Sequence, residues 1–219
     1  MTGGKRIMGL PSIRRMPMYY RLLARELEAG RTQISSAYIA EALGMEPIVV
    51  RKDFTLFGII GKPKIGYETE EALQVIDSLM NSRDSNEAFL VGVGNLGQAL
   101  LSYRGFEHMG LDLIAGFDVD SDIVGRRIQG REIFALVELP RLAKRLHVKT
   151  GILCVPEEAA QDCADAMVDA GIEGIWNFAP VRLQVPDYVV VQNEDLAEGL
   201  AILIVKLNQS KREGIQRTN

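Results

Sequence analysis

The sequence predicts an α/β chain of two domains: an N-terminal winged helix-turn-helix and then a doubly wound parallel sheet. A glycine-rich turn, residues 89–97, lies almost ninety residues into a chain of 219. Strand-like apolar runs alternate with helical patterns after it, which is typical of a parallel sheet. The segment before it is helical and basic, so we expect it to fold separately.

Charge divides the chain at nearly the same place. Residues 1–66 carry 11 Lys and Arg against 5 Asp and Glu, whereas residues 67–219 carry 14 against 24. The net charges are therefore +6 and −10. A basic first third suits a polyanion such as nucleic acid, although a solvated basic surface without a ligand is the alternative.

The first third has helix-turn-helix spacing. Helices are expected over 16–28, over 37–43 with Ser35 or Ser36 as N-cap, and from Pro47 to Phe57. The inward stripe of the third helix comprises Val50, Phe54 and Phe57. Another face of that helix carries Arg51, Lys52 and Thr55, and it is the face that we expect to enter a major groove.

Residues 58–67 are expected to form a short β-hairpin with Lys62 and Lys64 at its tip. A helix-turn-helix followed by a basic hairpin describes a winged helix. These lysines would then lie along phosphates or in the adjoining minor groove.

The remaining two thirds read as a Rossmann-type sheet after a linking helix, 70–80, and a polar break, 81–86. We expect strands at 88–93, 111–117, 131–135, 149–155, 172–178 and 187–192, and helices at 95–104, 137–146 and 157–170. The expected divisions are 1–80 for the winged helix, 81–195 for the sheet domain, and 196–219 for a terminal helix and tail.

The glycine-rich turn has the G-x-G-x-x-G pattern that binds a dinucleotide. Its glycines allow a tight turn and a close approach to a pyrophosphate, which also meets the positive end of the next helix. The expected cradle comprises Gly92, Val93, Gly94, Asn95, Leu96 and Gly97. Asp118 follows 21 residues after Gly97. An acid there binds a ribose 2′-OH and repels a 2′-phosphate, so NAD(H) is favoured over NADP(H).

Two further strand ends fall at the same edge of the sheet. Val155 and Pro156 follow one strand, and residues 177–180 follow another. We expect Val155, Pro156, Asn177, Phe178, Ala179 and Pro180 to line the nicotinamide half of the crevice. Ordinary strand-end turns are the alternative.

The segment 196–207 is apolar nearly all round a helical wheel, so it needs cover on several sides. At about twelve residues it is too short to span a bilayer. Burial within the domain and burial against a second subunit both fit, and we favour the subunit. The N-terminus lacks a signal-peptide core, and Cys154 and Cys163 read as reduced thiols without a metal site, so we expect a cytoplasmic protein without a membrane partner.

Several motifs together resemble the bacterial Rex family of redox-sensing transcriptional repressors. They are Val50-Arg51-Lys52-Asp53, Phe57-Gly58, Ile65-Gly66-Tyr67, the glycine-rich turn, Phe117-Asp118-Val119-Asp120, Val155-Pro156 and the run from Asn177 to Leu183. The match extends from about residue 11 to residue 208. The resemblance implies a homodimer that binds palindromic operator DNA through paired winged helices and releases it when NADH binds, with NAD⁺ competing.

The resemblance also implies roles for single residues. Tyr103 matches a tyrosine that approaches the nicotinamide pocket, and Arg21 and Asp195 match a pair linking the two domains. The terminal helix would be exchanged between subunits. The DNA-facing set that we expect comprises Arg14, Arg15, Ser35, Ser36, Pro47, Arg51, Lys52, Thr55, Lys62 and Lys64. One departure concerns the wing, where Pro63 and Lys64 stand in place of the arginine and glycine of the family pattern.

Two other classes of protein share the glycine-rich turn. An NAD-dependent oxidoreductase with an accessory DNA-binding domain would need a proton donor beside the hydride path. The two histidines, His108 and His147, are not at an expected strand end. A CoA-binding ligase domain would leave the winged helix without a purpose. We therefore predict a repressor without enzymatic activity.

Overall fold

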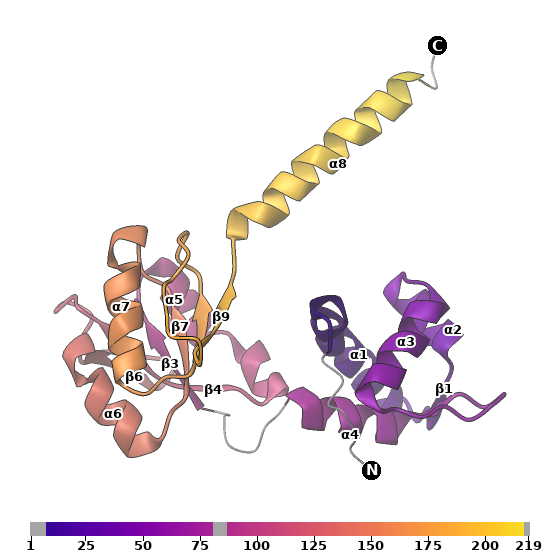
Figure 1. Cartoon of the computed structure of the whole chain (residues 1–219), viewed down its shortest axis with the longest axis horizontal. Helices are drawn as coiled ribbons and strands as arrows, with labels where there is room; N and C mark the ends of the chain where they lie inside the picture. The colour runs from indigo at the N-terminus through magenta and orange to yellow at the C-terminus, as the bar shows by residue number, and fades with distance from the viewer. Residues whose placement is uncertain (1–7, 81–86, 217–219) are drawn as a thin grey trace. The chain divides into compact units, whose positions relative to one another are not determined.

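The computed structural model describes residues 8–80 and 87–216. It divides the chain into two compact units, Met1–Asp84 and Ser85–Asn219 (Figure 1). Each unit has hydrophobic core residues of its own.

Four helices and two short strands make up the N-terminal unit. They are α1 (Leu10–Glu28), β1 (Gln33–Ile34), α2 (Ser36–Leu43), α3 (Pro47–Phe57), β2 (Tyr67–Glu68) and α4 (Thr69–Met80). The Ser35 hydroxyl caps α2 by accepting a hydrogen bond from the Tyr38 N–H at 3.1 Å. Gly44 and Gly58 end α2 and α3 in the left-handed conformation, with φ of 66° and 84°. Helix α1 begins six residues before the expected start.

Aromatic side chains fill the core of this unit. Val50, Phe54 and Phe57 of α3 are buried as the sequence predicts. The Phe54 ring packs edge-on against Tyr19 of α1 and Tyr67 of β2, with centroid distances of 5.2 and 4.7 Å. These contacts fix which side of α3 faces the interior.

The expected hairpin over 58–67 is wrong in detail. Lys62 and Gly66 form one isolated antiparallel bridge, and Tyr67 pairs instead with Ile34 of β1. The sequence missed β1 because a two-residue strand has no measurable alternation. The wing is thus a loop that closes on β1.

The second unit contains a seven-stranded sheet in the order β5-β6-β4-β3-β7-β8-β9. Its strands are β3 (Glu87–Val91), β4 (Asp112–Asp118), β5 (Arg127–Ile128), β6 (Arg131–Ala135), β7 (Thr150–Leu153), β8 (Gly174–Asn177) and β9 (Val190–Asn193). All neighbours are parallel except β5 and β6. The six parallel strands follow the Rossmann order, with the switch point beside β3. The antiparallel edge strand β5 lies between the expected strands 111–117 and 131–135, where no element was expected.

Helices cover the two faces of this sheet. Helix α5 (Asn95–Leu101) and the 3₁₀ helix η1 (Arg104–Met109) pack with Leu90 and Leu113, whereas α6 (Leu139–Leu146) and α7 (Glu157–Asp169) pack with Phe89 and Phe117. Successive residues of β3 therefore serve opposite faces. A short 3₁₀ turn, η2 (Leu136–Glu138), leads into α6.

The last helix, α8 (Leu196–Gln216), runs nine residues beyond the expected end and is drawn as one straight rod in Figure 1. Its large apolar side chains between residues 196 and 207 are exposed in the single chain, from 47% for Ile202 to 68% for Leu196. None of the helices within 8–80 and 87–216 combines the length and apolarity needed to cross a membrane.

The turn between β3 and α5 depends on two glycines. A Cβ built on Gly97 would lie 2.0 Å from the Gly92 carbonyl oxygen, and Gly92 itself has a φ of +91°. Helix α5 therefore approaches the end of β3 more closely than any side chain allows. Gly94 differs, since a Cβ there meets nothing within 4 Å.

We predict that Gly97→Ala lowers the free energy of unfolding of the second unit by about 2 to 3 kcal/mol, because the methyl group must push α5 off the sheet. Gly94→Ala is the matched control and should unfold at nearly the wild-type denaturant concentration. Urea unfolding followed by circular dichroism measures both. Equal midpoints for the two variants would contradict the close approach.

Candidate dinucleotide cleft and nucleic-acid surface

A cleft of about 360 Å³ opens at the carboxyl edge of the sheet, where the glycine-rich turn faces the end of β7. Six residues expected to bind the cofactor line it: Gly92, Val93, Gly94, Asp118, Val155 and Pro156. Asn95, Leu96 and Gly97 lie just behind them in the first turn of α5. The cleft is at the switch point of the strand order, where open α/β sheets bind ligands.

The Asp118 carboxylate is held by three backbone N–H groups. Oδ2 accepts from Val93 at 2.6 Å, and Oδ1 accepts from Val119 at 2.7 Å and from Asp120 at 2.9 Å. A carboxylate offers about four acceptor positions, so one remains for a hydroxyl in the cleft. Asp118 thus fixes the glycine-rich turn and keeps its charge beside the cleft. The sequence predicted a ribose contact for Asp118 but not its hold on the turn.

Gln98 was not predicted and also faces the cleft. Its side-chain amide donates to the Val93 carbonyl at 3.0 Å. Both polar groups of Val93 are therefore fixed by side chains from α5 and β4. Spacing does not reveal such a contact, since glutamine at this position is also an ordinary surface residue of a helix.

Asn177 is fully buried and holds the turn that follows β8. Its Nδ2 donates to the Val181 carbonyl and to Asn193 Oδ1, both at 2.9 Å, and its Oδ1 accepts from Ala179 N–H at 3.0 Å. None of residues 177–180 lines the cleft of the single chain. For Asn177, the geometry fits the strand-end turn that the sequence left as the alternative.

A row of aromatic rings joins two residues expected near the nicotinamide. Tyr103 is 58% exposed and packs edge-on against Phe106 at 4.9 Å. Phe106 contacts Trp176 at 5.7 Å, and Trp176 contacts Phe178 at 4.7 Å. Phe106 and Trp176 were not singled out from the sequence, because aromatic core residues carry no spacing signal.

In the N-terminal unit, Arg51, Lys52 and Thr55 lie on one exposed side of α3 and border a shallow hollow with Leu56. Arg51 Nη1 donates to the Ser36 hydroxyl at 3.2 Å. Four residues of the expected DNA-facing set, three on α3 and one on α2, are therefore neighbours. An exposed helix side with two basic residues is compatible with a groove of duplex DNA.

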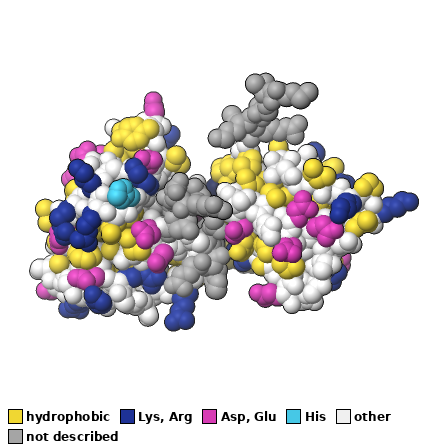
Figure 2. Space-filling model, turned by 90° about the horizontal axis from the view of Figure 1, so that it is seen from below, with side chains coloured by type: hydrophobic (Ala, Val, Ile, Leu, Met, Phe, Trp, Pro, Cys, Tyr) yellow, Lys and Arg dark blue, Asp and Glu magenta, His cyan; other side chains and the backbone are white. Residues whose placement is uncertain are grey.

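The wing loop carries two exposed lysines that differ in their contacts and backbone conformation. Lys62 Nζ forms an ion pair with Glu68 at 3.1 Å, whereas Lys64 adopts a φ of +66°. Pro63 and Lys64 occupy the second and third positions of a turn closed by the Ile65 N–H and the Lys62 carbonyl at 3.2 Å. A turn with proline at its second position and a positive φ at its third position favours glycine at the third. Figure 2 shows basic side chains projecting at this end of the unit, at the right edge of the view.

Four other expected residues have distinct surroundings. Arg14 is exposed, but the Arg15 guanidinium donates to the buried Asp53 carboxylate at 2.6 and 2.8 Å, which differs from the DNA-facing role that we expected for it. Arg21 is exposed on α1. Asp195 Oδ1 accepts from the Ala197 N–H at 2.8 Å and caps α8.

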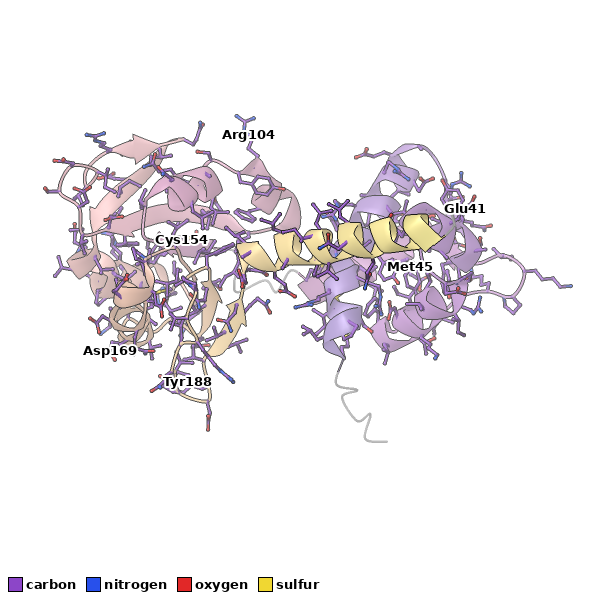
Figure 3. The ribbon with its side chains drawn as sticks, turned by 90° about the horizontal axis from the view of Figure 1, so that it is seen from above. Glu41, Met45, Arg104, Cys154, Asp169 and Tyr188 are labelled. Atoms are coloured by element: carbon purple, nitrogen blue, oxygen red, sulfur yellow. The ribbon has the colours of Figure 1, made fainter. Side chains whose placement is uncertain are left out.

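Both cysteines lie beside the cleft. Burial raises the pKa of the Cys154 thiol to about 12. Burial also raises the pKa of Cys163, and the charges of Asp162 and Asp118 add to the effect. Figure 3 shows Cys154 inside the second unit. Within the described part of the chain, no three His, Cys, Asp or Glu side chains come together as a metal site.

Comparison with known proteins gives two family models and many full-length relatives. Residues 9–55 match the model "Putative DNA-binding protein N-terminus", and residues 83–181 match "CoA binding domain". The redox-sensing transcriptional repressor Rex of Treponema denticola is 42% identical over 94% of this chain and 99% of its own. The Rex protein of Desulforamulus reducens is 41% identical over 90% of this chain and 93% of its own.

Among solved structures, the Rex-family repressor RSP in complex with NAD⁺ and operator DNA superposes with a TM-score of 0.87. It is 32% identical and covers 97% of this chain and 98% of its own. These matches span both units, whereas the CoA-binding model covers only residues 83–181 of the second unit.

We predict that Lys64→Gly raises the free energy of unfolding by about 0.5 to 1 kcal/mol, because glycine adopts a positive φ without the steric cost of a Cβ. Lys62→Gly is the control and should be destabilising, since it removes an ion pair and gains no backbone relief. Urea midpoints measure both. A lower midpoint for Lys64→Gly than for the wild type would contradict the strain.

We predict that neither cysteine reacts readily with iodoacetamide at pH 8 in the folded protein. With a pKa of about 12, only about one Cys154 thiol in ten thousand is the reactive thiolate at that pH. Unfolding in urea returns the pKa to about 8.5, so alkylation should become fast. Mass spectrometry of the digested protein measures the rate at each cysteine, and equal rates in both states would contradict the burial.

Proposed function

The chain belongs to the Rex family of redox-sensing transcriptional repressors, and we propose that it binds palindromic operator DNA as a homodimer and releases it on binding NADH. One observation carries this proposal: a single chain pairs a basic helix-turn-helix surface with an NAD-type cleft. An enzyme of the dehydrogenase class has no use for the first of these.

The cleft supports NADH and NAD⁺ as the ligands. The Asp118 carboxylate retains one free acceptor position at the place where a ribose 2′-OH binds, and its charge repels a 2′-phosphate. The reported RSP complexes contain NADH in one case and NAD⁺ in another. We propose the predicted cradle, Gly92 to Gly97, as the pyrophosphate site, and the 177–180 turn with Tyr103 as the nicotinamide side.

The N-terminal unit supports operator binding by two kinds of contact. We propose that Arg51, Lys52 and Thr55 reach base edges from α3, because they share its exposed side. Lys62, Lys64 and Arg14 would contact phosphates, together with Ser35, Ser36 and Pro47 at the helix N-termini. The palindrome follows from two-fold symmetry of the dimer.

Helix α8 supports the dimer. Seven large apolar side chains of residues 196–207 are exposed in the single chain, and patches of that kind mark interaction sites. We propose that each α8 is exchanged into the partner subunit. The Arg21 and Asp195 pair would then link a DNA-binding domain to a cofactor domain. A cytoplasmic location gives the dimer access to both DNA and the NADH pool.

Redox sensing then follows from linkage. NADH must bind the DNA-incompetent dimer more tightly than the competent one, and DNA weakens NADH binding by the same factor. A nicotinamide side formed by Pro156, Phe178 and Tyr103, as proposed above, would be mostly apolar, so it would disfavour the cationic ring of NAD⁺. The cofactor acts as a signal and undergoes no reaction.

We expect NADH to release the protein from a labelled palindromic duplex, selected by the protein from a random pool, at much lower concentration than NAD⁺. A gel shift titrated with each nucleotide measures this.

Arg51→Ala should weaken DNA binding about tenfold or more and leave NADH affinity intact. Gly94→Val should keep DNA binding and lose the response to NADH. Equal release by the two nucleotides would overturn the redox role, and loss of DNA binding in Gly94→Val would overturn the separation of roles.

A further inference from the structure

Asp53 lies on α3 between Lys52 and Thr55, yet its side chain faces the opposite way, into α1. It is 2% exposed. Four donors reach its two oxygens: Ser12 Oγ at 2.8 Å, Arg15 Nε at 2.6 Å, Arg15 Nη2 at 2.8 Å and Tyr19 OH at 2.7 Å. Positions 12, 15 and 19 lie on one face of α1. We call this set, Ser12, Arg15, Tyr19 and Asp53, the α1–α3 clamp.

Both carboxylate oxygens of Asp53 are hydrogen-bonded within the clamp. A buried carboxylate is costly unless it is paired and hydrogen-bonded, and here both oxygens receive donors. Burial acts to raise the pKa of Asp53, but the hydrogen bonds from Arg15, Tyr19 and Ser12 outweigh burial and lower it. Burial and the neighbouring Asp53 raise the pKa of Tyr19. The Tyr19 hydroxyl therefore remains a donor at neutral pH, and the carboxyl remains an acceptor.

The aromatic packing turns one side of α3 inward, and the clamp ties one position on that side, Asp53, to α1. A helix turns about 100° per residue, so Arg51 and Thr55, two residues before and after Asp53, lie about 160° from it on either side. They are about 40° apart on the side opposite the clamp. Both are exposed, and the Thr55 hydroxyl donates to the Arg51 carbonyl at 2.8 Å. Holding Asp53 therefore aims Arg51 and Thr55 away from α1.

We propose that Arg15, Tyr19 and Ser12 are positioning residues for operator recognition, which hold α3 through Asp53 at the rotation where Arg51 and Thr55 read DNA. The proposal rests on the operator binding proposed above. It assigns Arg15 an internal role in place of a phosphate contact. The Arg15 side chain is 26% exposed, and two of its three guanidinium nitrogens are already bound to Asp53.

The substitution Arg15→Lys distinguishes a positioning role of Arg15 from a phosphate contact. Arg15→Lys keeps the charge that a phosphate needs, but it lacks the planar fork that spans both oxygens of Asp53. A phosphate contact would therefore survive Arg15→Lys and fail in Arg15→Met. A positioning role fails in both variants.

The test compares binding of the selected palindrome and of a scrambled duplex across salt concentrations, using Arg15→Lys, Arg15→Met and Tyr19→Phe. Arg14→Met, at the exposed neighbour, is the matched control. Circular dichroism and NADH titration first establish that each variant is folded at the working temperature. Tyr19→Phe removes one hydroxyl only, so it serves where the Arg15 variants fail to fold.

We expect Arg15→Lys and Arg15→Met to lose at least tenfold in affinity for the palindrome, and Tyr19→Phe about fivefold. Affinity of Arg15→Lys for the scrambled duplex and its salt dependence should be unchanged, so the ratio of the two affinities falls. A residue that only stabilised the fold would not change this ratio in folded protein. Arg14→Met should weaken both duplexes equally and reduce the salt slope by about 1.

Two results would overturn the clamp proposal. The first is that Arg15→Lys binds both duplexes with wild-type affinity. The second is that Arg15→Met loses affinity equally for both duplexes and its salt slope falls by about 1. Either would make Arg15 a phosphate contact. A wild-type protein that does not prefer the palindrome would overturn the proposed function itself, so the two failures are distinct.

Discussion

The close approach of Gly97 to the Gly92 carbonyl is the constraint on which the cofactor unit depends. With no Cβ at position 97, α5 begins directly over the end of β3. This brings the Val93 N–H within reach of Asp118, the last residue of β4. The turn and the neighbouring strand end then form one rigid wall of the cleft. Any side chain at position 97 would separate them, because α5 would have to move outward.

Both units contain a carboxylate that gathers several donors, and burial decides what each can do. Asp118 receives three backbone N–H groups but stays partly exposed, so an acceptor position remains for a ligand. Asp53 receives four side-chain hydrogen bonds and is closed to solvent. The first can take part in recognition directly, whereas the second can act only by holding α3. The same functional group would thus serve binding in one unit and positioning in the other under the roles proposed above.

Patterns within short stretches predicted most of the fold. Alternating strands and helices indicated the parallel sheet, and Pro47 marked the start of α3. Contacts between distant residues were not predictable. Arg15 and Asp53 are 38 positions apart, so Arg15 read as a surface cation suited to DNA. The bond from Asn177 to Asn193 joins two strands, so the sequence predicted only the place of Asn177 at a strand end. The spacing of residues within one helix or strand predicts which face of that element a side chain lies on. Its partners on other elements are determined by tertiary packing.

The dimerisation and the DNA recognition proposed above would be linked by the terminal helix α8. An amphipathic surface helix keeps one polar face in water, but the segment 196–207 is apolar nearly all round, so it needs cover on several sides. A second copy that receives α8 also brings a second α3 into the assembly. The symmetry of that pair dictates a palindromic site, since identical helices read identical half-sites. We infer that one dimer requires both helices. The apolar helix α8 holds the two subunits together, and the basic helix α3 provides the sequence specificity.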